Sequence, residues 1–256
     1  MEPTEKITPD WIRAAKSRGE RVAALTAYDY PTARLLDEAC VPLLLVGDSL
    51  GMVVLGYPDT TEVTLAEMRH HVAAVARAKT RALVVGDLPY HTYQTAQNAV
   101  ANAHILIEAG AEAIKLEGGL AVVPEITALR AAGLAVMGHI GMLPQHIKEE
   151  GRYKRKGRSE AEKELLMADA LAVEEAGAFA LVLEAVEHEL AGAITARLTI
   201  PTISIGSGPH CYGQIMVTPD LIGSFPWFRP KFAIAKADVA SAIRSAAEGF
   251  VNEVRG

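Results

Sequence analysis

The stretch that decides the fold runs from Leu43 to Gly51 and reads LLLVGDSLG. Four aliphatic residues are followed by a glycine, a carboxylate and a hydroxyl. A continuous apolar run of this kind predicts a strand that is buried on both faces, as in a parallel sheet. An acid at its end can lie only where the strand leaves the core, so we expect Asp48 at the rim of the sheet.

Three further segments end in the same way. Residues 82–89 read ALVVGDLP and place Asp87 at an equivalent exit. The segments EAGAEAIKLEG and EAGAFALVLEA end their apolar runs at Glu117 and Glu184. Parallel strands joined by helices release their carboxyl ends on one face, so the four acids converge if the strands close into a barrel. Converging carboxylates repel one another and need a cation, a shared proton or separation by solvent.

Length and composition favour a single domain. The chain has 256 residues, 50% of them hydrophobic, which suits the roughly 250 residues and one large core of an eightfold α/β barrel. We therefore expect one domain over residues 1–256. The net charge of −6 and the pI near 5.8 argue against a nucleic-acid partner, because neutralising phosphates requires a basic face.

The sequence also argues against a membrane partner and a cysteine framework. No apolar run approaches the roughly 18 uncharged residues of a membrane span, and residues 1–10 lack the apolar core of a signal peptide. We therefore expect a cytoplasmic protein. Cys40 and Cys211 are the only cysteines and show no CxxC spacing, so we expect neither a zinc site nor a disulfide.

Eight apolar segments alternate with helical patterns along the chain, without a linker between them. This order predicts the α/β class and a single closed (β/α)8 TIM barrel, with a short N-terminal helix before the first strand. Thr64 and Glu67 have the spacing of a capping box. The expected strands are 21–26, the runs ending at Asp48 and Asp87, 113–117, 134–139, 180–184, 201–205 and 232–234. The expected helices are 9–16, those beginning at Pro31 and Thr64, 95–109, 121–132, 160–176, 187–197 and 237–253.

Two loops are unusual. The segment 142–158 is long and carries six basic residues from Lys148 to Arg158, so it could be a lid over an anion, or a solvated or subunit-contacting loop. The segment 206–214 is rich in glycine and follows the seventh expected strand, where barrels often bind phosphate through backbone amides.

Several residues at the expected rim carry chemistry. Lys115 and Glu117 are two apart on one strand, so both point into the barrel, which is costly unless they pair with a ligand or a metal. Without a ligand they could be an ion pair at the rim, and Asp48 and Asp87 could each simply cap the helix that follows its strand. His139 is more often a core residue when it stands alone, but it lies at the same rim and is a candidate substrate contact. Glu184 ends an apolar strand and is a candidate general base.

Together these residues carry a resemblance that spans nearly the whole chain. The sequence resembles the ketopantoate hydroxymethyltransferase family, also called 3-methyl-2-oxobutanoate hydroxymethyltransferase. The segments that carry the resemblance are TAYDYPTA (26–33), VGDSLGMV (46–53), GDLPY (86–90), IKLEGG (114–119), GHIGMLPQ (138–145), YKRKGR (153–158), LVLEAV (181–186) and GSGPHCYGQIMVTPD (206–220).

The resemblance implies a fold, a reaction and a site. The family is a (β/α)8 barrel related to the phosphoenolpyruvate mutase and isocitrate lyase group, and it transfers a hydroxymethyl group from 5,10-methylenetetrahydrofolate to 2-oxoisovalerate, the first step of pantothenate biosynthesis. It implies a magnesium ion and a homo-oligomer, a decamer in the family. It assigns these residues: Asp48, Asp87 and Glu117 as metal ligands; Asp48, Ser49, Asp87, Lys115 and His139 as substrate-binding residues; and Glu184 as the proton acceptor.

The chain departs from the family pattern in the rim loops. Tyr212-Gly213-Gln214 stands where Asp-Gly-Gln is usual, Pro219 where histidine is usual, and His91-Thr92 where Met-Ser is usual, while the chain also ends early, at Gly256. The exact 2-oxo acid, the folate contacts and the preferred divalent metal therefore stay open.

Three alternatives remain. One is a related aldolase that acts on a different 2-oxo acid. Another is a magnesium-dependent lyase or mutase of the phosphoenolpyruvate mutase group, although neither Cys40 nor Cys211 lies in the catalytic-cysteine segment of those enzymes. The last is a non-catalytic barrel, which predicts loss of the acids at the strand ends.

Overall fold

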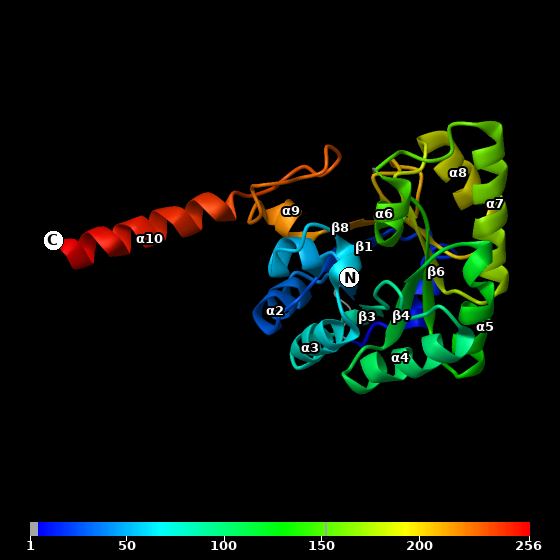
Figure 1. The fold of residues 1–256 in the computed structure, drawn as a ribbon, viewed down its shortest axis with the longest axis horizontal. Helices are drawn as coiled ribbons and strands as arrows, with labels where there is room; N and C mark the ends of the chain where they lie inside the picture. The colour runs from blue at the N-terminus through cyan, green and yellow to red at the C-terminus, as the bar shows by residue number, and fades with distance from the viewer. Residues whose placement is uncertain (1–4, 152) are drawn as a thin grey trace. The chain divides into compact units, whose positions relative to one another are not determined.

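The eight strands form one closed barrel in the computed structural model, which describes residues 5–151 and 153–256. The strands follow the order of the chain from β1 to β8, and each pairs in parallel with the next. Helices including α3, α4, α5 and α7 lie outside the strands (Figure 1). The predicted (β/α)8 TIM barrel, with a short helix before its first strand, is therefore confirmed.

The helices and strands have the following bounds. The strands are β1 (Val22–Thr26), β2 (Leu43–Val46), β3 (Leu83–Asp87), β4 (Ala113–Glu117), β5 (Val136–Gly141), β6 (Ala180–Glu184), β7 (Thr202–Ile205) and β8 (Gly213–Met216). The α-helices are α1 (Pro9–Arg13), α2 (Tyr30–Glu38), α3 (Leu65–Ala76), α4 (Ala96–Glu108), α5 (Val123–Ala131), α6 (Ile147–Glu150), α7 (Glu160–Glu175), α8 (His188–Arg197), α9 (Thr218–Ile222) and α10 (Val239–Arg255). Short turns of other helix types are η1 (Gly51–Leu55), η2 (Thr60–Glu62), η3 (Leu120–Val122) and η4 (Pro144–His146).

Alternate residues along each strand belong to two different apolar clusters. In β2, Leu43 and Leu45 join the cluster inside the barrel, and Leu44 and Val46 join the one that packs against the helices. A strand turns successive side chains to opposite faces, so both faces of this strand are buried, as its apolar run predicted. The same alternation turns the last residue of β3, Asp87, toward the barrel interior.

The first helix closes the amino-terminal end of the barrel. Ile12 of α1 is fully buried and belongs to the inner cluster. Thr8 caps this helix by accepting a hydrogen bond from the Trp11 N–H at 3.1 Å. The predicted capping box of α3 is confirmed, because the side chains of Thr64 and Glu67 each accept a hydrogen bond from the other residue's backbone N–H.

The eighth strand does not lie where the sequence predicted it. The strand is β8, in which Gly213 is paired with Ile203 of β7, whereas residues 232–234 form no strand. The N–H of Val22 donates to the carbonyl of Tyr212 at 2.8 Å, next to the closing edge. The prediction was wrong because GQIM is short and contains a glycine and a glutamine, which hides it from an apolar pattern. The Phe232–Ile234 triplet instead follows a turn that begins at Pro230.

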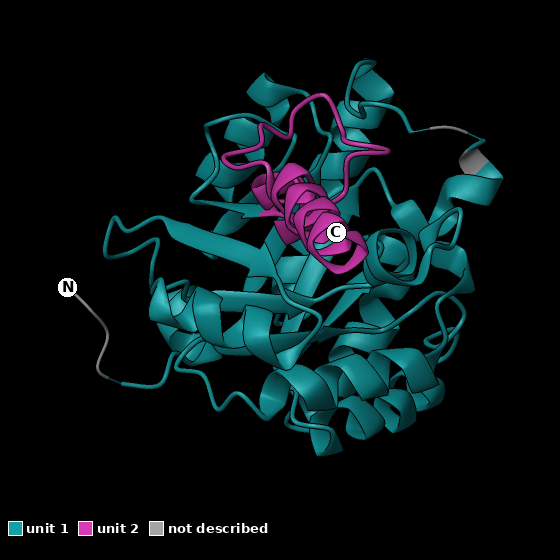
Figure 2. Cartoon of the chain, turned by 90° about the vertical axis from the view of Figure 1, so that its left-hand side faces the viewer, with its two compact units in different colours: residues 1–215 teal, residues 216–256 magenta. Residues whose placement is uncertain are grey.

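The chain divides into two compact units, residues 1–215 and 216–256 (Figure 2). The expectation of one domain over the whole chain stays a prediction. The second unit contains α9 and the 17-residue helix α10. Ile243, Phe250 and Val254 of α10 share one face at helical spacing and are exposed. Among the described residues, no helix is long and apolar enough to cross a bilayer.

Candidate active site

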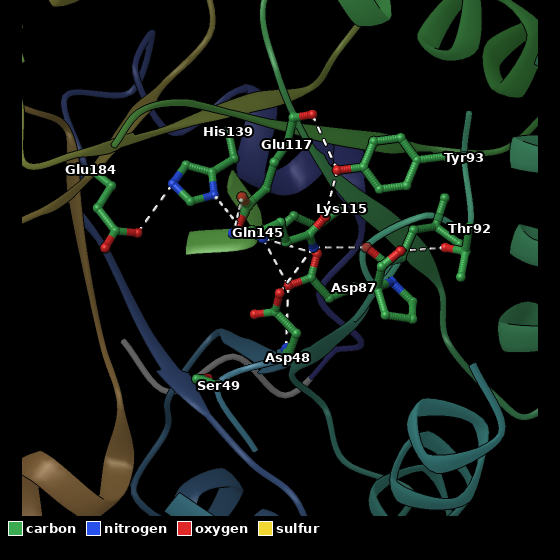
Figure 3. A network of polar contacts seen from close by, with 12 residues as sticks. Asp48, Ser49, Asp87, Thr92, Tyr93, Lys115, Glu117, His139, Gln145 and Glu184 are labelled. Atoms are coloured by element: carbon green, nitrogen blue, oxygen red, sulfur yellow. Dashed lines mark hydrogen bonds and ion pairs between the residues drawn. The ribbon is translucent and has the colours of Figure 1, made fainter. Parts of the chain in front are cut away.

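The acids that the sequence placed at strand ends meet at the carboxyl end of the barrel (Figure 3). Asp87, Glu117 and Glu184 are the last residues of β3, β4 and β6, and Asp48 follows β2 by two residues. A continuous series of contacts shorter than 4 Å joins six of the predicted residues. In order, they are Asp48, Asp87, Lys115, Glu117, His139 and Glu184.

Lys115 lies between two carboxylates. Strand register sets Asp87 directly opposite Lys115, and the Lys115 Nζ contacts both Asp87 oxygens, at 2.7 and 2.9 Å, and Glu117 Oε1 at 3.5 Å. All three side chains are at least 95% buried. Burial alone would lower the pKa of Lys115, but the charges of Asp87 and Glu117 outweigh it and raise that pKa. Lys115 therefore stays an ammonium ion at neutral pH.

Asp48 and Asp87 lie beside each other in the buried site. The backbone N–H of Asp48 donates to Asp87 Oδ2 at 3.4 Å. Burial, followed by the negative charges of Asp87 and Glu117, raises the pKa of Asp48 well above its ordinary value. Burial also raises the pKa of Asp87, against the opposing effect of Lys115. A divalent cation beside this pair would offset the negative charge that, after burial, opposes the ionisation of both acids.

His139 connects the metal side of the site to Glu184. Its Nδ1 is 3.2 Å from Glu117 Oε1 and its Nε2 is 3.2 Å from Glu184 Oε2. Burial alone would lower the pKa of His139, but the negative charge of Glu117 and hydrogen bonds to both carboxylates raise it to about 9. His139 is therefore cationic at neutral pH. Four carboxylates thus face two cationic side chains, and this imbalance suits one divalent cation.

The residues fit a magnesium site built on two carboxylates. Among the described residues, no group of three or more His, Cys, Asp and Glu side chains is arranged to hold a metal ion by itself. Magnesium is commonly bound by one or two carboxylates, with water and substrate filling the other positions, so the Asp48 and Asp87 pair suits it. Glu117 instead faces His139, Lys115 and a backbone N–H. Its role as a third ligand stays a prediction.

The backbone around Glu184 is fixed by groups that the sequence did not single out. The hydroxyl of Ser207 donates to the Leu183 carbonyl at 2.7 Å and accepts from the Val186 N–H at 2.9 Å, so it spans the strand end. Gly141 lies so close that an added Cβ would be 2.3 Å from the Glu184 carbonyl oxygen. Ser207 belongs to the glycine-rich segment 206–214, which here supports the end of β6.

Ser49 lies beside Asp48, and its hydroxyl is 2.8 Å from the hydroxyl of Tyr28. Tyr28 follows β1 and is 4% exposed, and its carbonyl lies 2.7 Å from His71 Nδ1. The TAYDYPTA and VGDSLGMV segments therefore meet through these two hydroxyls. The predicted contact of Ser49 with substrate stays a prediction.

Gln145 and Tyr93 belong to the site, but sequence reasoning gave them no role. Gln145 is fully buried in η4, and its side chain reaches Asp48. Burial, followed by the charges of Glu117 and Asp87, raises the pKa of Tyr93 above its ordinary range, so its hydroxyl stays protonated and can donate. No local signal marked Gln145, because it lies in the turn between Pro144 and His146 after β5 has ended.

The basic segment 142–158 contacts several neighbours. Lys148 lies 3.8–3.9 Å from Glu62 and Asp59. Arg155 donates to the Val186 carbonyl at 2.9 Å, and Arg158 pairs with Glu187 at 3.1 Å. These cations are therefore engaged with the loops after β2 and β6. Arg152, which the sequence counted in this segment, lies outside the described residues, and the choice between a lid and a contact loop stays a prediction.

Comparisons with known proteins identify a family for the chain. The family model described as ketopantoate hydroxymethyltransferase matches residues 6–256. The chain is 53% identical to the 3-methyl-2-oxobutanoate hydroxymethyltransferase of Moorella thermoacetica, over 100% of this chain and 96% of the relative. It is also 53% identical to the enzyme of that name from Caldivirga maquilingensis, over 98% of this chain and 94% of the relative.

Solved structures of other families share the fold. A phosphonopyruvate hydrolase in complex with oxalate and magnesium superposes with a TM-score of 0.65 at 15% identity, covering 97% of this chain and 87% of that one. A 2,3-dimethylmalate lyase of the phosphoenolpyruvate mutase and isocitrate lyase superfamily gives a TM-score of 0.63 at 18% identity, covering 97% and 88%. At these identities the likeness is one of fold.

Proposed function

Because the chain belongs to the ketopantoate hydroxymethyltransferase family, and is thus an enzyme of the hydroxymethyltransferase class, we propose that it transfers a hydroxymethyl group from 5,10-methylenetetrahydrofolate to 3-methyl-2-oxobutanoate. The observation that carries the proposal is the series of buried contacts from Asp48 to Glu184. It joins a paired-carboxylate cation site to a candidate base at the other end. Such an arrangement can abstract a proton next to a ketone.

Asp48 and Asp87 would hold a magnesium ion. When bound, magnesium would act as a Lewis acid toward the 2-oxo group of the substrate. Lys115 adds a fixed positive charge beside the carboxylate pair, where negative charge develops on the substrate oxygen. The Ser49 hydroxyl, which lies 2.8 Å from the Tyr28 hydroxyl, would donate to the carboxylate of the oxo acid.

Glu184 is the proposed proton acceptor. The C3–H bond of the oxo acid breaks, the proton passes to a Glu184 oxygen, and the electron pair left on the enolate forms a C–C bond to the methylene carbon of the folate. The two bonds from that carbon to the folate nitrogens break, water supplies the hydroxyl oxygen of the product, and tetrahydrofolate leaves with the protons returned to its nitrogens. Glu184 suits this role because it is partly accessible, with a side chain 12% exposed, while the other acids of the site are almost fully buried. His139 holds the Glu184 carboxylate in place at 3.2 Å.

The test is product formation from a panel of 2-oxo acids with methylenetetrahydrofolate. We expect ketopantoate from 3-methyl-2-oxobutanoate, loss of turnover in a chelator, and recovery with magnesium. Hydroxymethylation of a different 2-oxo acid would instead identify the related aldolase. Cleavage or rearrangement of an oxo acid without folate would favour the lyase reading.

We further propose that the chain forms a homo-oligomer, as the decameric family it resembles does. Support comes from the exposed apolar face of α10, since a contiguous apolar stripe on a surface helix marks an interaction site. Light scattering of the purified chain measures its mass. A monomeric mass over the working concentration range would contradict this proposal.

A further inference from the structure

Gln145 is bonded through every polar group of its side chain. Its Nε2 lies 2.9 Å from Asp48 Oδ2 and 3.0 Å from the Leu88 carbonyl oxygen, and its Oε1 lies 2.6 Å from the Tyr93 hydroxyl. Its backbone N–H donates to Glu117 Oε2 at 3.1 Å. One loop residue after β5 therefore joins groups that follow β2 and β3 and the last residue of β4 (Figure 3).

The chemistry of these partners fixes the orientation of the amide. The Asp48 carboxylate and the Leu88 carbonyl can only accept, so the amide nitrogen must face them. A flipped amide would set its oxygen against two other oxygens. The Tyr93 hydroxyl donates to the amide oxygen at 2.6 Å, which makes the opposite orientation unfavourable from both sides.

In the part of the chain that the structure describes, the two cationic side chains of the site contact acids other than Asp48. Lys115 lies within ion-pair distance of Asp87 and Glu117, and His139 of Glu117 and Glu184. Among the described residues, Gln145 supplies the one side-chain hydrogen bond to the Asp48 carboxylate. A neutral amide fixes one carboxylate oxygen without cancelling its charge, whereas a lysine there would compete with a metal ion for Asp48.

We propose that Gln145 is a positioning residue for the metal site, oriented by Tyr93: its amide holds Asp48 Oδ2 so that the carboxylate presents its other oxygen to a divalent cation. This inference rests on the proposed function, because it takes Asp48 as a metal ligand. It adds two residues that act through Asp48 and touch neither substrate nor metal.

The experiment measures Mn²⁺ affinity of the intact enzyme by electron paramagnetic resonance, in the presence of the oxo acid and without folate. The variants are Gln145→Met, which keeps the length of the side chain and the backbone N–H, Tyr93→Phe and the double variant. Tyr212→Phe is the matched control, because Tyr212 precedes β8 at the opposite end of the barrel.

We expect Gln145→Met to weaken Mn²⁺ binding by about 10–100-fold, as loss of a residue that orients a metal ligand does. Tyr93→Phe should weaken it by about 2–10-fold, the effect of one hydrogen bond. The double variant should bind as Gln145→Met does, because Tyr93 acts through Gln145. Excess metal should restore most of kcat in Gln145→Met, so that the change lies mainly in the metal concentration required.

Parent-like Mn²⁺ binding in a folded Gln145→Met would overturn the inference while leaving the proposed function in place. If the double variant binds Mn²⁺ more weakly than Gln145→Met by the full factor seen in Tyr93→Phe, Tyr93 does not act by orienting Gln145. Its effect would then come from its contact with the Glu117 carbonyl, 3.3 Å from its hydroxyl. If Gln145→Met does not fold, unchanged binding in Tyr93→Phe overturns the inference by itself. A parent enzyme that binds Mn²⁺ but forms no hydroxymethylated product overturns only the proposed function.

Discussion

Acidic residues occupy both ends of the barrel but make opposite kinds of contact. At the carboxyl end, Asp48 and Asp87 are buried beside each other, and burial, followed by the negative charge of neighbouring acids, opposes their ionisation. At the amino end, Glu174 accepts from the N–H groups of Thr199 and Ile200 at 2.6 and 2.9 Å, just before β7.

Asp37 repeats the second pattern, because its Oδ1 accepts from the N–H groups of Arg81 and Ala82, just before β3. The acids at the amino end accept hydrogen bonds from backbone N–H groups, and these bonds hold the loops before β3 and β7 in place. The acids at the carboxyl end contact mainly other side chains, with one backbone N–H each at Asp87 and Glu117, and leave charge available for a ligand. The difference teaches that acids at the amino end of the barrel serve stability, whereas acids at its carboxyl end serve chemistry.

The largest expected effect is at Glu184. Glu184→Gln should reduce exchange of the C3 hydrogen of 3-methyl-2-oxobutanoate with D₂O by about 10²–10⁴-fold, the contribution of a positioned general base. Nuclear magnetic resonance follows the exchange without folate. Glu189→Gln on the exposed face of α8 is the control and should exchange at the parent rate. Parent-rate exchange in Glu184→Gln would assign the base to another residue.

The next effect concerns the paired acids. Asp48→Asn and Asp87→Asn should each weaken metal-dependent binding of the oxo acid by at least about 10-fold, because a neutral amide replaces a charged ligand. Calorimetry with and without magnesium measures this. Asp37→Asn makes the same chemical change at the amino end and should leave metal binding unaltered. Loss of metal binding in Asp37→Asn would contradict the conclusion that only the acids at the carboxyl end of the barrel hold the metal.

A smaller effect on stability is expected at the amino end. Glu174→Ala should lower the free energy of unfolding by about 1–2 kcal/mol, because two N–H groups and the Thr199 hydroxyl lose a charged acceptor. Urea titration measures it, and Glu175→Ala, which is exposed on the same helix, is the control. If Glu174→Ala exchanges the C3 hydrogen of 3-methyl-2-oxobutanoate near the parent rate, the substitution affects stability alone.

The pH dependence of this variant follows from the sign of the shift. Hydrogen bonds from Thr199 and Ile200 outweigh the effect of burial and lower the pKa of Glu174 below its ordinary value of 4.5. The folded state therefore binds the proton less readily than the unfolded state. The stabilisation is complete above pH 4.5 and is lost as the pH falls through the lowered pKa. The difference in stability between the parent and Glu174→Ala should shrink below pH 4.5, and a constant difference down to pH 3 would contradict it.

The smallest effect is expected for an acid that is exposed to solvent and accepts from no backbone N–H of a neighbouring loop among the contacts described above. Glu38 on α2 pairs with Arg34 at 3.5 Å, and both side chains are more than half exposed. Surface pairs of this kind add little to stability, so Glu38→Ala should shift the melting temperature by no more than about 2 °C. A shift as large as that of Glu174→Ala would show that surface pairing matters as much as backbone contacts.

The sequence was sufficient for those parts of the site that lie on regular strands. Asp87, Lys115 and Glu117 could be placed because an apolar strand with period two fixes which side chains face inward and where the strand ends. His139 and Glu184 could be placed at the same rim by the same reasoning. The barrel itself followed from the alternation of strands and helices.

The parts that could not be predicted depend on contacts between distant loops. Gln145 acts through the turn that follows β5, and Ser207 through a loop that reaches back to β6, so neither shows a local pattern. β8 was missed because its four residues take their strand conformation from pairing with β7 and lack an apolar run of their own. Tertiary contacts overrode local preference at that strand.

The contact between Lys115 and Asp87 has a consequence for how the enzyme acquires its metal. The ammonium group already occupies both oxygens of Asp87 and serves as a built-in counter-ion. The barrel can therefore fold without a divalent ion, because the almost fully buried Asp87 is already paired with Lys115. A divalent ion held by Asp48 and Asp87 would then share Asp87 with Lys115, whose charge stays beside the carboxylate pair. Loss of such an ion would reduce activity while leaving the barrel folded.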